Sequence, residues 1–311
     1  MSRAGTAALL GRPNAGKSTL VNALVGTKVA IVSSRPQTTR HRIAGVLTEP
    51  RGQVVFFDLP GVHRPLHRLN VQMMHVLRDT LREVDVVVQL FDASLAPGGG
   101  EEFVVSLLDG LDVPAILVPN KIDLPDAAAS LAERTGFYTT RHAYAAVAPV
   151  AALTGAGTAE LKDALFDRLP EGEPWLDPKL STTQTERFFV AELIREALLE
   201  RVEKELPFTS AVHVRDYGEE ESGSGPLLRV IADIVVDRDS QKGIVVGRSG
   251  AMIKAIGTAA RAQIEALLGA RVFLDLHVKA RPGWREDRRF LTELESVEAI
   301  LDAATAPEAE E

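Results

Sequence analysis

Residues 11–18 read Gly11-Arg12-Pro13-Asn14-Ala15-Gly16-Lys17-Ser18, and this stretch decides the class of fold. A glycine followed by four residues and then by Gly-Lys-Ser is the pattern of a phosphate-binding loop. An apolar segment at 6–10 precedes it and a helical pattern follows it, which is the context that the motif requires. We therefore expect backbone N–H groups around phosphate oxygens, Lys17 at the β- and γ-phosphates and Ser18 on Mg²⁺. The competing interpretation is an ordinary glycine-rich turn between a strand and a helix.

A second motif, Asp58-Leu59-Pro60-Gly61, ends the apolar segment at 53–58. A carboxylate at this point can hold Mg²⁺ through water, and the Gly61 N–H can contact the γ-phosphate. Alone, this short pattern is equally typical of a turn.

A third motif, Asn120-Lys121-Ile122-Asp123, follows the apolar segment at 114–119. The Asp123 carboxylate can accept hydrogen bonds from guanine N1–H and from the guanine 2-amino group, and adenine lacks both donors. A carboxylate left unpaired in a buried site rejects the wrong base strongly. A helix-capping coincidence would explain this motif alone. Three motifs in this order, each at the end of an apolar segment, predict a guanine-nucleotide site.

Apolar segments alternate with helical patterns through the first half of the chain. We expect strands at 6–10, 53–58, 84–91, 114–119 and 145–150. Most are continuously apolar, which is typical of strands buried on both faces, and they predict an α/β domain with a mostly parallel sheet and helices on both sides. The predicted limits are a GTP-binding domain at 1–170, a Pro- and Gly-containing linker at 171–184, an α+β domain at 185–285, and a C-terminal helix with an acidic tail at 286–311.

In these motifs the chain resembles the translation-factor-like GTPases, and within them the Era-like branch, whose members carry a C-terminal KH domain. The resemblance rests on residues 11–19 and on Ser34-Arg35-Pro36-Gln37-Thr38-Thr39-Arg40-His41-Arg42, which is similar to the switch I segment of that branch. It implies a P-loop GTPase fold and a threonine that closes on Mg²⁺ when GTP is bound. Thr39 is the expected residue and Thr38 the alternative. The competing interpretation is a polar loop whose arginines are merely solvated.

The resemblance implies a complete set of site residues. We expect Lys17, Thr39 and Gly61 to act in catalysis, and Ser18, Thr39 and Asp58 to hold Mg²⁺. The expected nucleotide-binding residues are Gly11, Arg12, Pro13, Asn14, Ala15, Gly16, Lys17, Ser18, Thr19, Asp58, Leu59, Pro60, Gly61, Val62, Asn120, Lys121, Ile122, Asp123, Ala151, Ala152 and Leu153.

Three positions depart from patterns of related GTPases. Leu59 stands where the family usually has Thr, and Ala151 stands where the last guanine-contacting loop usually has Ser, although the Ala152 N–H can still serve guanine O6. Val62 stands where Ras-like switches have the Gln that orients the attacking water. Hydrolysis then needs backbone positioning, Mg²⁺ and another positive charge. Asn14 suggests K⁺, because an Asn at this loop position helps bind K⁺ in related GTPases; the alternative is that Asn14 braces the loop.

The second half contains Val245-Val246-Gly247-Arg248-Ser249-Gly250-Ala251-Met252-Ile253-Lys254, which resembles the core of a KH domain. We expect strands at about 210–216 and 227–237, with an acidic, Gly- and Ser-rich loop at 218–226 between them. The expected order helix–strand–strand–helix–helix–strand is that of a type II KH domain, whose Gly-x-x-Gly loop holds the backbone of about four nucleotides. A helix C-cap is the alternative. Trp284 is expected to pack more readily than to stack on a base. The expected RNA-binding residues are Lys242, Ile244, Val245, Gly247, Arg248, Ser249, Gly250, Ile253, Lys254, Arg281 and Arg285.

Charge is distributed unevenly along the chain. The formal net charge of the whole chain is −8, which taken alone argues against a nucleic-acid partner, but this value averages over segments of opposite charge. Residues 1–48 hold seven Lys/Arg and no Asp/Glu, and residues 242–289 hold ten Lys/Arg against four Asp/Glu. Because a polyanion responds to the local patch, phosphate and RNA ligands remain compatible with the composition. The absence of cysteine excludes disulfides, thiolate metal sites and a cysteine nucleophile.

The resemblance implies a GTP-hydrolysing switch that binds small-subunit ribosomal RNA near its 3′ end and assists assembly of the small ribosomal subunit. We expect a cytoplasmic protein, because no apolar run reaches the roughly 20 residues of a membrane helix and no signal-peptide core is present. A monomer is expected, because nothing in the sequence suggests an obligate oligomer. Peripheral contact with the inner face of the cell membrane is left open. The alternatives are a GTPase acting on another RNA, in tRNA modification or as a general RNA chaperone, and an RNA-binding scaffold with a vestigial nucleotide site.

Overall fold

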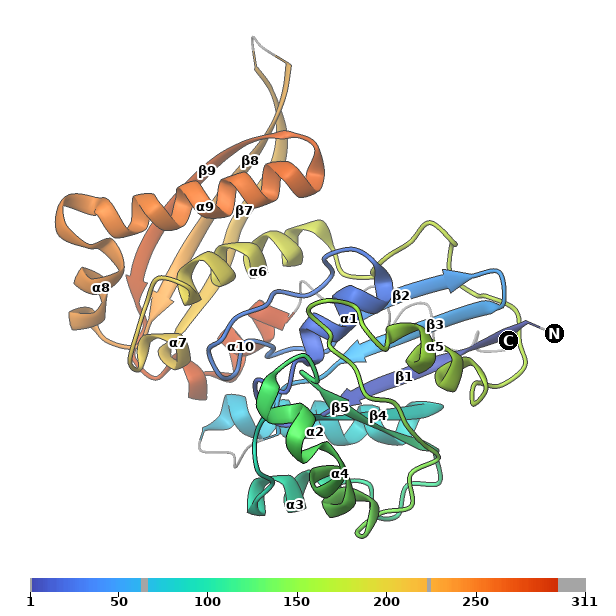
Figure 1. Ribbon diagram of the computed structural model, residues 1–311. Coiled ribbons are helices and arrows are strands. Elements are labelled where there is room, and N and C mark those ends of the chain that lie inside the picture. The colour runs from blue at the N-terminus through green and yellow to red at the C-terminus, as the bar shows by residue number, and fades with distance from the viewer. Residues whose placement is uncertain (1, 63–66, 223–224, 296–311) are drawn as a thin grey trace, which may run out of the picture. The chain divides into compact units, whose positions relative to one another are not determined.

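Six strands of the first half of the chain form one sheet in the order β2-β3-β1-β4-β5-β6 (Figure 1). The structure is a computed structural model that describes residues 2–62, 67–222 and 225–295. Neighbouring strands are parallel except β2 and β3. The strands are β1 Arg3–Leu10, β2 Ile43–Glu49, β3 Gly52–Asp58, β4 Val86–Asp92, β5 Ala115–Asn120 and β6 Ala146–Val147.

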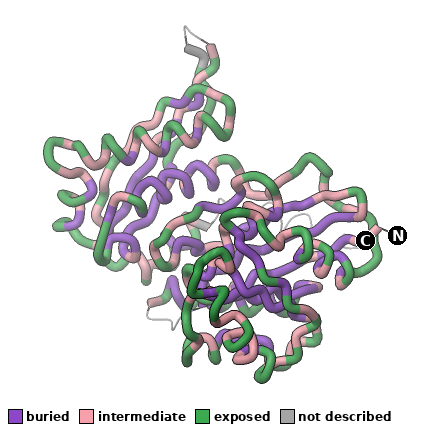
Figure 2. Tube along the Cα trace, viewed as in Figure 1, coloured by how far each residue is buried: buried purple, intermediate pink, exposed green. Residues whose placement is uncertain are grey.

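Helices cover both faces of this sheet. Helix α1 contributes Leu20 to one core cluster, and α3 and α4 contribute Val105 and Tyr138 to another. Leu90 and Phe91, consecutive in β4, belong to the first and the second cluster, because successive side chains of a strand point to opposite faces. The strands of this sheet are mostly buried (Figure 2). The predicted fold class is confirmed. The helices are α1 Lys17–Val25, α2 Arg68–Glu83, α3 Gly99–Ser106, α4 Pro125–Thr139 and α5 Thr158–Phe166.

Strand β2 was not predicted from the sequence. It pairs in antiparallel fashion with β3, from Ile43 opposite Asp58 to Glu49 opposite Gly52. Its outer edge is bonded to a later segment, since the Val46 N–H donates to Ser181 O over 2.8 Å and the Thr182 hydroxyl donates to Ala44 O over 2.6 Å. Its register therefore depends on partners that are distant in the sequence.

The second half contains a three-stranded sheet in the order β7-β8-β9, in which β7 and β8 are antiparallel and β8 and β9 are parallel. The expected order of elements and the α+β class are confirmed. The loop expected at 218–226 is instead mostly strand, because β7 and β8 continue as a long hairpin (Figure 1). The elements are α6 Glu186–Leu199, α7 Leu206–Thr209, β7 Ser210–Ser222, β8 Gly225–Val236, α8 Asp239–Val246, η1 Arg248–Gly250, α9 Ala251–Leu268, β9 Arg271–Ala280, η2 Trp284–Glu286 and α10 Arg288–Glu295.

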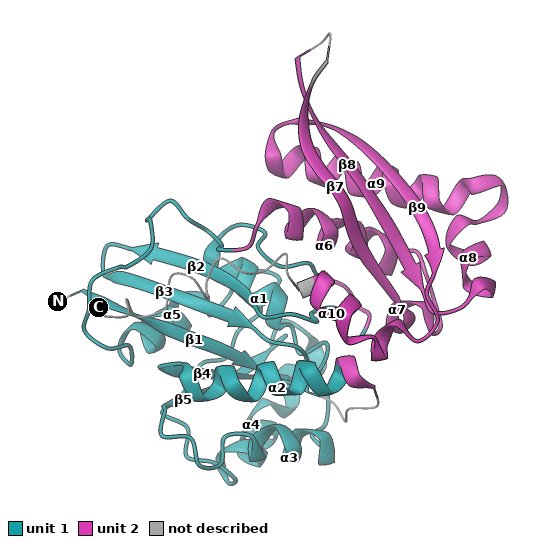
Figure 3. Ribbon diagram, turned by 180° about the vertical axis from the view of Figure 1, so that it is seen from behind, with its two compact units in different colours: residues 1–32, 36–66, 70–183 teal, residues 33–35, 67–69, 184–311 magenta. Residues whose placement is uncertain are grey.

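The chain divides into two compact units (Figure 3). The first comprises residues 1–32, 36–66 and 70–183, and the second comprises 33–35, 67–69 and 184–311. The part of the expected C-terminal helix and acidic tail at 296–311 lies outside the described residues. Among the described helices, none has the length and apolar character needed to cross a membrane.

Candidate functional site

The phosphate loop joins the end of β1 to the start of α1. Asn14 and Gly16 have φ values of 65° and 95°, so both adopt the left-handed conformation. A Cβ added at Gly16 would lie 2.1 Å from Asn120 Nδ2, which leaves room only for glycine. Residues of alternating handedness before a helix N-terminus form a concave backbone that binds anions. The structure therefore gives this loop the shape that the motif predicted.

Lys17 lies under this loop with 6% of its surface exposed. Its Nζ donates to the carbonyl oxygens of Gly11 and Arg12, each over 3.1 Å. Burial lowers the pKa of Lys17 to about 8, against the opposing effect of the Asp58 and Glu101 carboxylates. A buried ammonium held by neutral carbonyls gains from an arriving phosphate, because the phosphate supplies the opposite charge that the buried cation needs.

Ser18, Thr39 and Asp58 come together next to Lys17. The Ser18 hydroxyl donates to Asp58 Oδ2 over 2.5 Å, the Thr39 hydroxyl donates to the same oxygen over 3.1 Å, and the two hydroxyls are 2.9 Å apart. Among the described residues, Asp58 Oδ1 is buried without a hydrogen-bond partner, and burial raises the pKa of Asp58. Hydroxyl and carboxylate oxygens are the ligands that Mg²⁺ prefers, so the donor set fits Mg²⁺.

Asn120 links the third motif to the phosphate loop. Its Nδ2 donates to Ala15 O over 2.8 Å, and its Oδ1 accepts from the Lys121 N–H over 2.8 Å. Lys121 forms an ion pair with Asp92 at 2.6 Å. Beside these residues lies a pocket of about 250 Å³. Its lining residues are Gly16, Thr19, Asn120, Lys121, Asp123, Leu124, Ala152 and Leu153.

Backbone bonds support the last loop of this pocket. Ala151 is buried, its N–H donates to Ala156 O over 2.9 Å, and its carbonyl accepts from the Thr154 N–H over 3.1 Å. These bonds use only backbone groups, so they do not require a serine hydroxyl at this position. The Ala152 N–H donates to Asn120 Oδ1 over 3.0 Å, so it can reach guanine O6 only as a shared donor. Leu153 is 83% exposed at the rim.

The Asp58–Gly61 motif packs directly on the phosphate loop. A Cβ added at Gly61 would lie 2.7 Å from the Pro13 nitrogen, and the Val62 N–H donates to Gly11 O over 3.1 Å. Leu59 and Val62 are buried, so the two unusual apolar residues belong to the core. Val62 therefore offers its backbone, and not its side chain, to the catalytic region.

The Gly-x-x-Gly loop lies between α8 and α9. Gly247, Ser249 and Gly250 have φ values of 73°, 52° and 79°. A Cβ added at Gly247 would lie 2.6 Å from Met252 Cβ, so a side chain there would force the loop to move. Arg248 and Ser249 are exposed between the glycines. This shape permits the close approach of a phosphodiester backbone.

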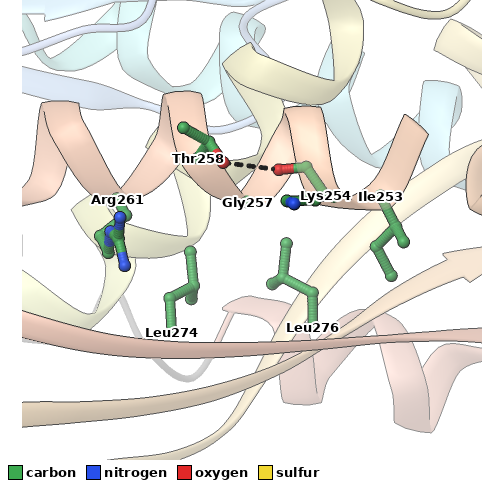
Figure 4. A pocket seen from close by; sticks show the side chains of 7 residues that line it. All are labelled: Ile253, Lys254, Gly257, Thr258, Arg261, Leu274 and Leu276. Carbon is green, nitrogen blue, oxygen red and sulfur yellow. Dashed lines mark hydrogen bonds between the residues drawn. The ribbon is translucent and has the colours of Figure 1, made fainter. Parts of the chain in front are cut away.

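A groove of about 390 Å³ runs beyond this loop between α9 and β9 (Figure 4). Leu274 and Leu276 of β9 form its apolar floor, and Lys254 and Arg261 of α9 place two cations on its rim. An apolar wall beside cations suits unstacked bases and their phosphates. The lining residues are Ile253, Lys254, Gly257, Thr258, Arg261, Leu274 and Leu276.

The sequence found only part of this groove. Ile253 and Lys254 line it as expected, but Val245 is fully buried and its side chain cannot line a groove. Arg261, Leu274 and Leu276 were missed. The sequence pattern could have identified them. Lys254 and Arg261 are seven positions apart and so lie on one face of a helix, and the two leucines are two positions apart and so lie on one face of a strand.

Four predicted RNA-binding cations lie outside the residues that line the groove. Arg248 is exposed in the Gly-x-x-Gly loop, and the other three are each paired with an acid: Lys242 with Asp239 at 3.3 Å, Arg281 with Asp287 at 2.6 Å, and Arg285 with Asp237 at 3.7 Å. Trp284 packs, as expected: it is 1% exposed, and its indole N–H donates to Thr209 O over 3.0 Å. These contacts occupy the side chains within the domain.

Two family models match the chain. Residues 6–121 match the 50S ribosome-binding GTPase model, and residues 217–285 match the KH domain model. Among curated proteins, the chain is similar to GTPase Era of Geobacter metallireducens, with 43% identity over 94% of this chain and 97% of the relative. It is also 43% identical to GTPase Era of Heliobacterium modesticaldum, over 91% of this chain and 94% of the relative.

Two solved structures are similar along nearly the whole chain. One is a crystal structure of Era in complex with MgGDPNP and nucleotides 1506–1542 of 16S ribosomal RNA, with a TM-score of 0.89 and 34% identity over 94% of this chain and 99% of that one. The other is a variant of Aquifex aeolicus Era bound to GDP and AlF₄⁻, with a TM-score of 0.89 and 33% identity over 94% of this chain and 98% of that one.

Proposed function

This chain belongs to the Era family of GTPases, and from that premise we propose that it is a GTP-driven switch that binds the 3′ end of small-subunit ribosomal RNA and assists assembly of the small subunit. One observation carries the proposal: the same chain contains two sites. The first is the phosphate loop with Asp58 and Asp123, and the second is the groove beyond the Gly247–Gly250 loop. We place this activity in the cytoplasm, where a monomer would meet the assembling subunit.

Each part of the nucleotide site has a distinct task in this proposal. The phosphate loop binds the phosphates through backbone N–H groups, and the buried Lys17 ammonium stabilises their negative charge. Ser18, Thr39 and Asp58 would hold Mg²⁺, which when bound neutralises charge between the β- and γ-phosphates. Thr39 belongs to switch I, so its hydroxyl would report the presence of the γ-phosphate to that segment.

The attacking water must be oriented without a glutamine side chain. Val62 is buried and its N–H is bonded to Gly11 O, so we assign the orientation of the water to the backbone near Gly61 and Thr39. This arrangement supplies fewer polar contacts to the water than a Ras-like glutamine does. Slow intrinsic hydrolysis is therefore expected, as a switch requires.

We assign the missing positive charge to K⁺ held near Asn14. Asn14 lies in the left-handed part of the loop with φ of 65°. A monovalent cation beside the phosphates would stabilise the charge that develops during hydrolysis. Turnover should therefore be faster in KCl than in NaCl at equal ionic strength, and Asn14→Ala should remove the difference. Equal turnover in the two salts would refute this assignment.

The RNA surface proposed here is the groove between α9 and β9. Arg248 and Ser249 at the loop tip and Lys254 and Arg261 on the rim would contact phosphates, while Leu274 and Leu276 would pack against bases. The bound ribosomal fragment in the similar Era structure supports the choice of RNA.

The test is RNA affinity at one fixed salt concentration, with a GTP analogue, with GDP and without nucleotide. Fixed salt is required because phosphate contacts make affinity strongly salt-dependent. Tighter binding to the small-subunit 3′ end in the GTP-analogue state supports the proposal. Equal binding to a scrambled sequence of the same length would favour the alternative of a GTPase acting on another RNA.

A further inference from the structure

Arg12 of the phosphate loop rests on the first turn of α3. Its Nη1 lies 3.8 Å from Glu101 Oε1. A Cβ added at Gly100 would lie 2.8 Å from Arg12 Cζ and 2.9 Å from Arg12 Nε, so the guanidinium packs against the bare backbone of that glycine. The Arg12 side chain thus points to α3, where it contacts the backbone of Gly100 and pairs with the carboxylate of Glu101.

Glu101 is itself largely buried. Only 14% of its side chain is exposed, and the Tyr138 hydroxyl of α4 interacts with its carboxyl group. Tyr138 is stacked on Phe91 with 4.2 Å between the ring centroids, at the end of β4. Burial raises the pKa of Glu101, and Arg12 opposes that shift. The Glu101 carboxyl group is therefore a largely buried partner for Arg12: it lies beside Tyr138, and its Oε2 atom has no hydrogen-bond partner among the described residues.

The backbone of Arg12 takes part in the phosphate loop. Its carbonyl oxygen accepts from Lys17 Nζ over 3.1 Å and from the Ala15 N–H over 3.3 Å. The opposite side of the loop is held by Asn120, which donates to Ala15 O over 2.8 Å. The loop, with its left-handed residues, is thus held from two sides: by the base-recognition motif and by α3. Strained loops persist only when their surroundings restrain them.

We propose that Glu101 is a positioning residue for the phosphate loop, acting through Arg12 to hold the loop in its phosphate-binding shape. The proposal rests on the nucleotide site proposed above. The contact between Arg12 and Glu101 lies outside the reacting groups. Its loss should therefore weaken the binding of GTP and of GDP equally, and should leave turnover at saturating GTP unchanged.

The experiment measures dissociation constants for GTP and GDP, together with kcat and KM, in the wild-type protein, Glu101→Gln and Glu102→Gln. Glu102 is the matched control: it follows on the same helix, its side chain is 57% exposed, and it pairs with Arg141, which lies just after α4. We expect Glu101→Gln to raise both dissociation constants and KM about threefold to fivefold, the size of a partly exposed ion pair, with kcat unchanged. Glu102→Gln should match the wild type.

The double variant Arg12→Ala with Glu101→Gln separates positioning from a general loss of stability. If Glu101 acts through Arg12, adding Glu101→Gln to Arg12→Ala should change nucleotide affinity no further. Additive effects of the two substitutions, or unchanged affinity in Glu101→Gln, would overturn the proposal while leaving the nucleotide site in place. A wild-type protein that fails to bind guanine nucleotides would instead overturn the site itself.

Discussion

Lys17 shows how burial prepares a residue for an anionic ligand. Its ammonium is buried and faces two carbonyl oxygens, and burial lowers its pKa to about 8. A bound phosphate would stabilise the charged form and raise this pKa again. Binding and protonation of Lys17 are therefore linked, because the nucleotide binds best to the form that carries the proton.

The first prediction follows from that linkage. Near pH 8 a part of the nucleotide-free protein has neutral Lys17, so binding of GDP should take up protons, and affinity should fall as pH rises above 8. Calorimetry in two buffers of different ionisation enthalpy measures this uptake. Lys17→Arg, whose charge is permanent, is the control and should show no uptake from this position. Proton release, or equal uptake in the two proteins, would contradict the lowered pKa.

The second prediction concerns choice of base. Asp123 lines the pocket beside the phosphate loop, where its carboxylate can pair with the two guanine donors. Asp123→Asn reverses that pattern and should transfer preference from GTP to XTP, with a loss of GTP affinity of about 10-fold or more. Competition between the two nucleotides measures the ratio. An unchanged preference for GTP would remove Asp123 from base recognition.

At the scale of single residues, short motifs predicted side chains that the fold brings together. Each motif fixes its chemistry within a few adjacent residues, and the structure places Ser18, Thr39 and Asp58 together. The pairing of Ala152 with Asn120 was not predictable, because it joins two loops that only the folded sheet brings together.

Elements were predicted where their pattern was local and missed where it depended on distant partners. The buried strands of the first sheet have continuous apolar segments, but β2 lies at an edge and receives hydrogen bonds from residues 181–182. Similarly, β7 and β8 were predicted too short. The acidic residues of the hairpin discouraged a strand assignment, whereas the Cα partners of Glu219 and Glu220 are Leu228 and Leu227.

The third prediction concerns the groove between α9 and β9. Lys254→Ala and Arg261→Ala should each weaken RNA binding by about 1–3 kcal/mol and lower the salt dependence of affinity by about one phosphate contact. Lys242→Ala removes the same charge from α8, where Lys242 pairs with Asp239, and serves as the control. RNA titrations at several salt concentrations check both quantities. Equal losses in all three variants would indicate a general charge effect, and the groove would lose its assignment.

A replacement of both loop glycines tests the same element independently. Gly247→Asp with Gly250→Asp places acids where φ is 73° and 79° and brings a side chain against Met252. Repulsion of phosphate and distortion of the loop should abolish RNA binding, while GTP hydrolysis continues because the substitutions lie in the other unit. Unchanged RNA affinity in this variant would remove the Gly-x-x-Gly loop from the RNA site.

At the scale of the whole molecule, the chain between the two units is tied to the strand that follows switch I. Residues 43–49 form β2, and Thr39 lies shortly before them. The segment that leads to α6 contacts β2 through Ser181 and Thr182, and upstream Gln53 of β3 accepts from the Trp175 and Leu176 N–H groups. Hydrogen bonds thus connect β2, which follows switch I, to the segment that leads into the second unit.

The last prediction tests that connection with a single hydroxyl. Thr182→Val removes the bond from the Thr182 hydroxyl to Ala44 O and leaves a similar volume, which should cost about 1 kcal/mol of stability. GTP hydrolysis without RNA should persist, since Ser18, Thr39 and Asp58 are untouched. The ratio of RNA affinities between the GTP-analogue and GDP states should move toward one, because a nucleotide shifts RNA binding only as far as the two states differ. Thr182→Ser keeps the hydroxyl and should keep the ratio. If Thr182→Val keeps the wild-type ratio of RNA affinities, the hydrogen bond from Thr182 to Ala44 does not couple the nucleotide state to RNA binding.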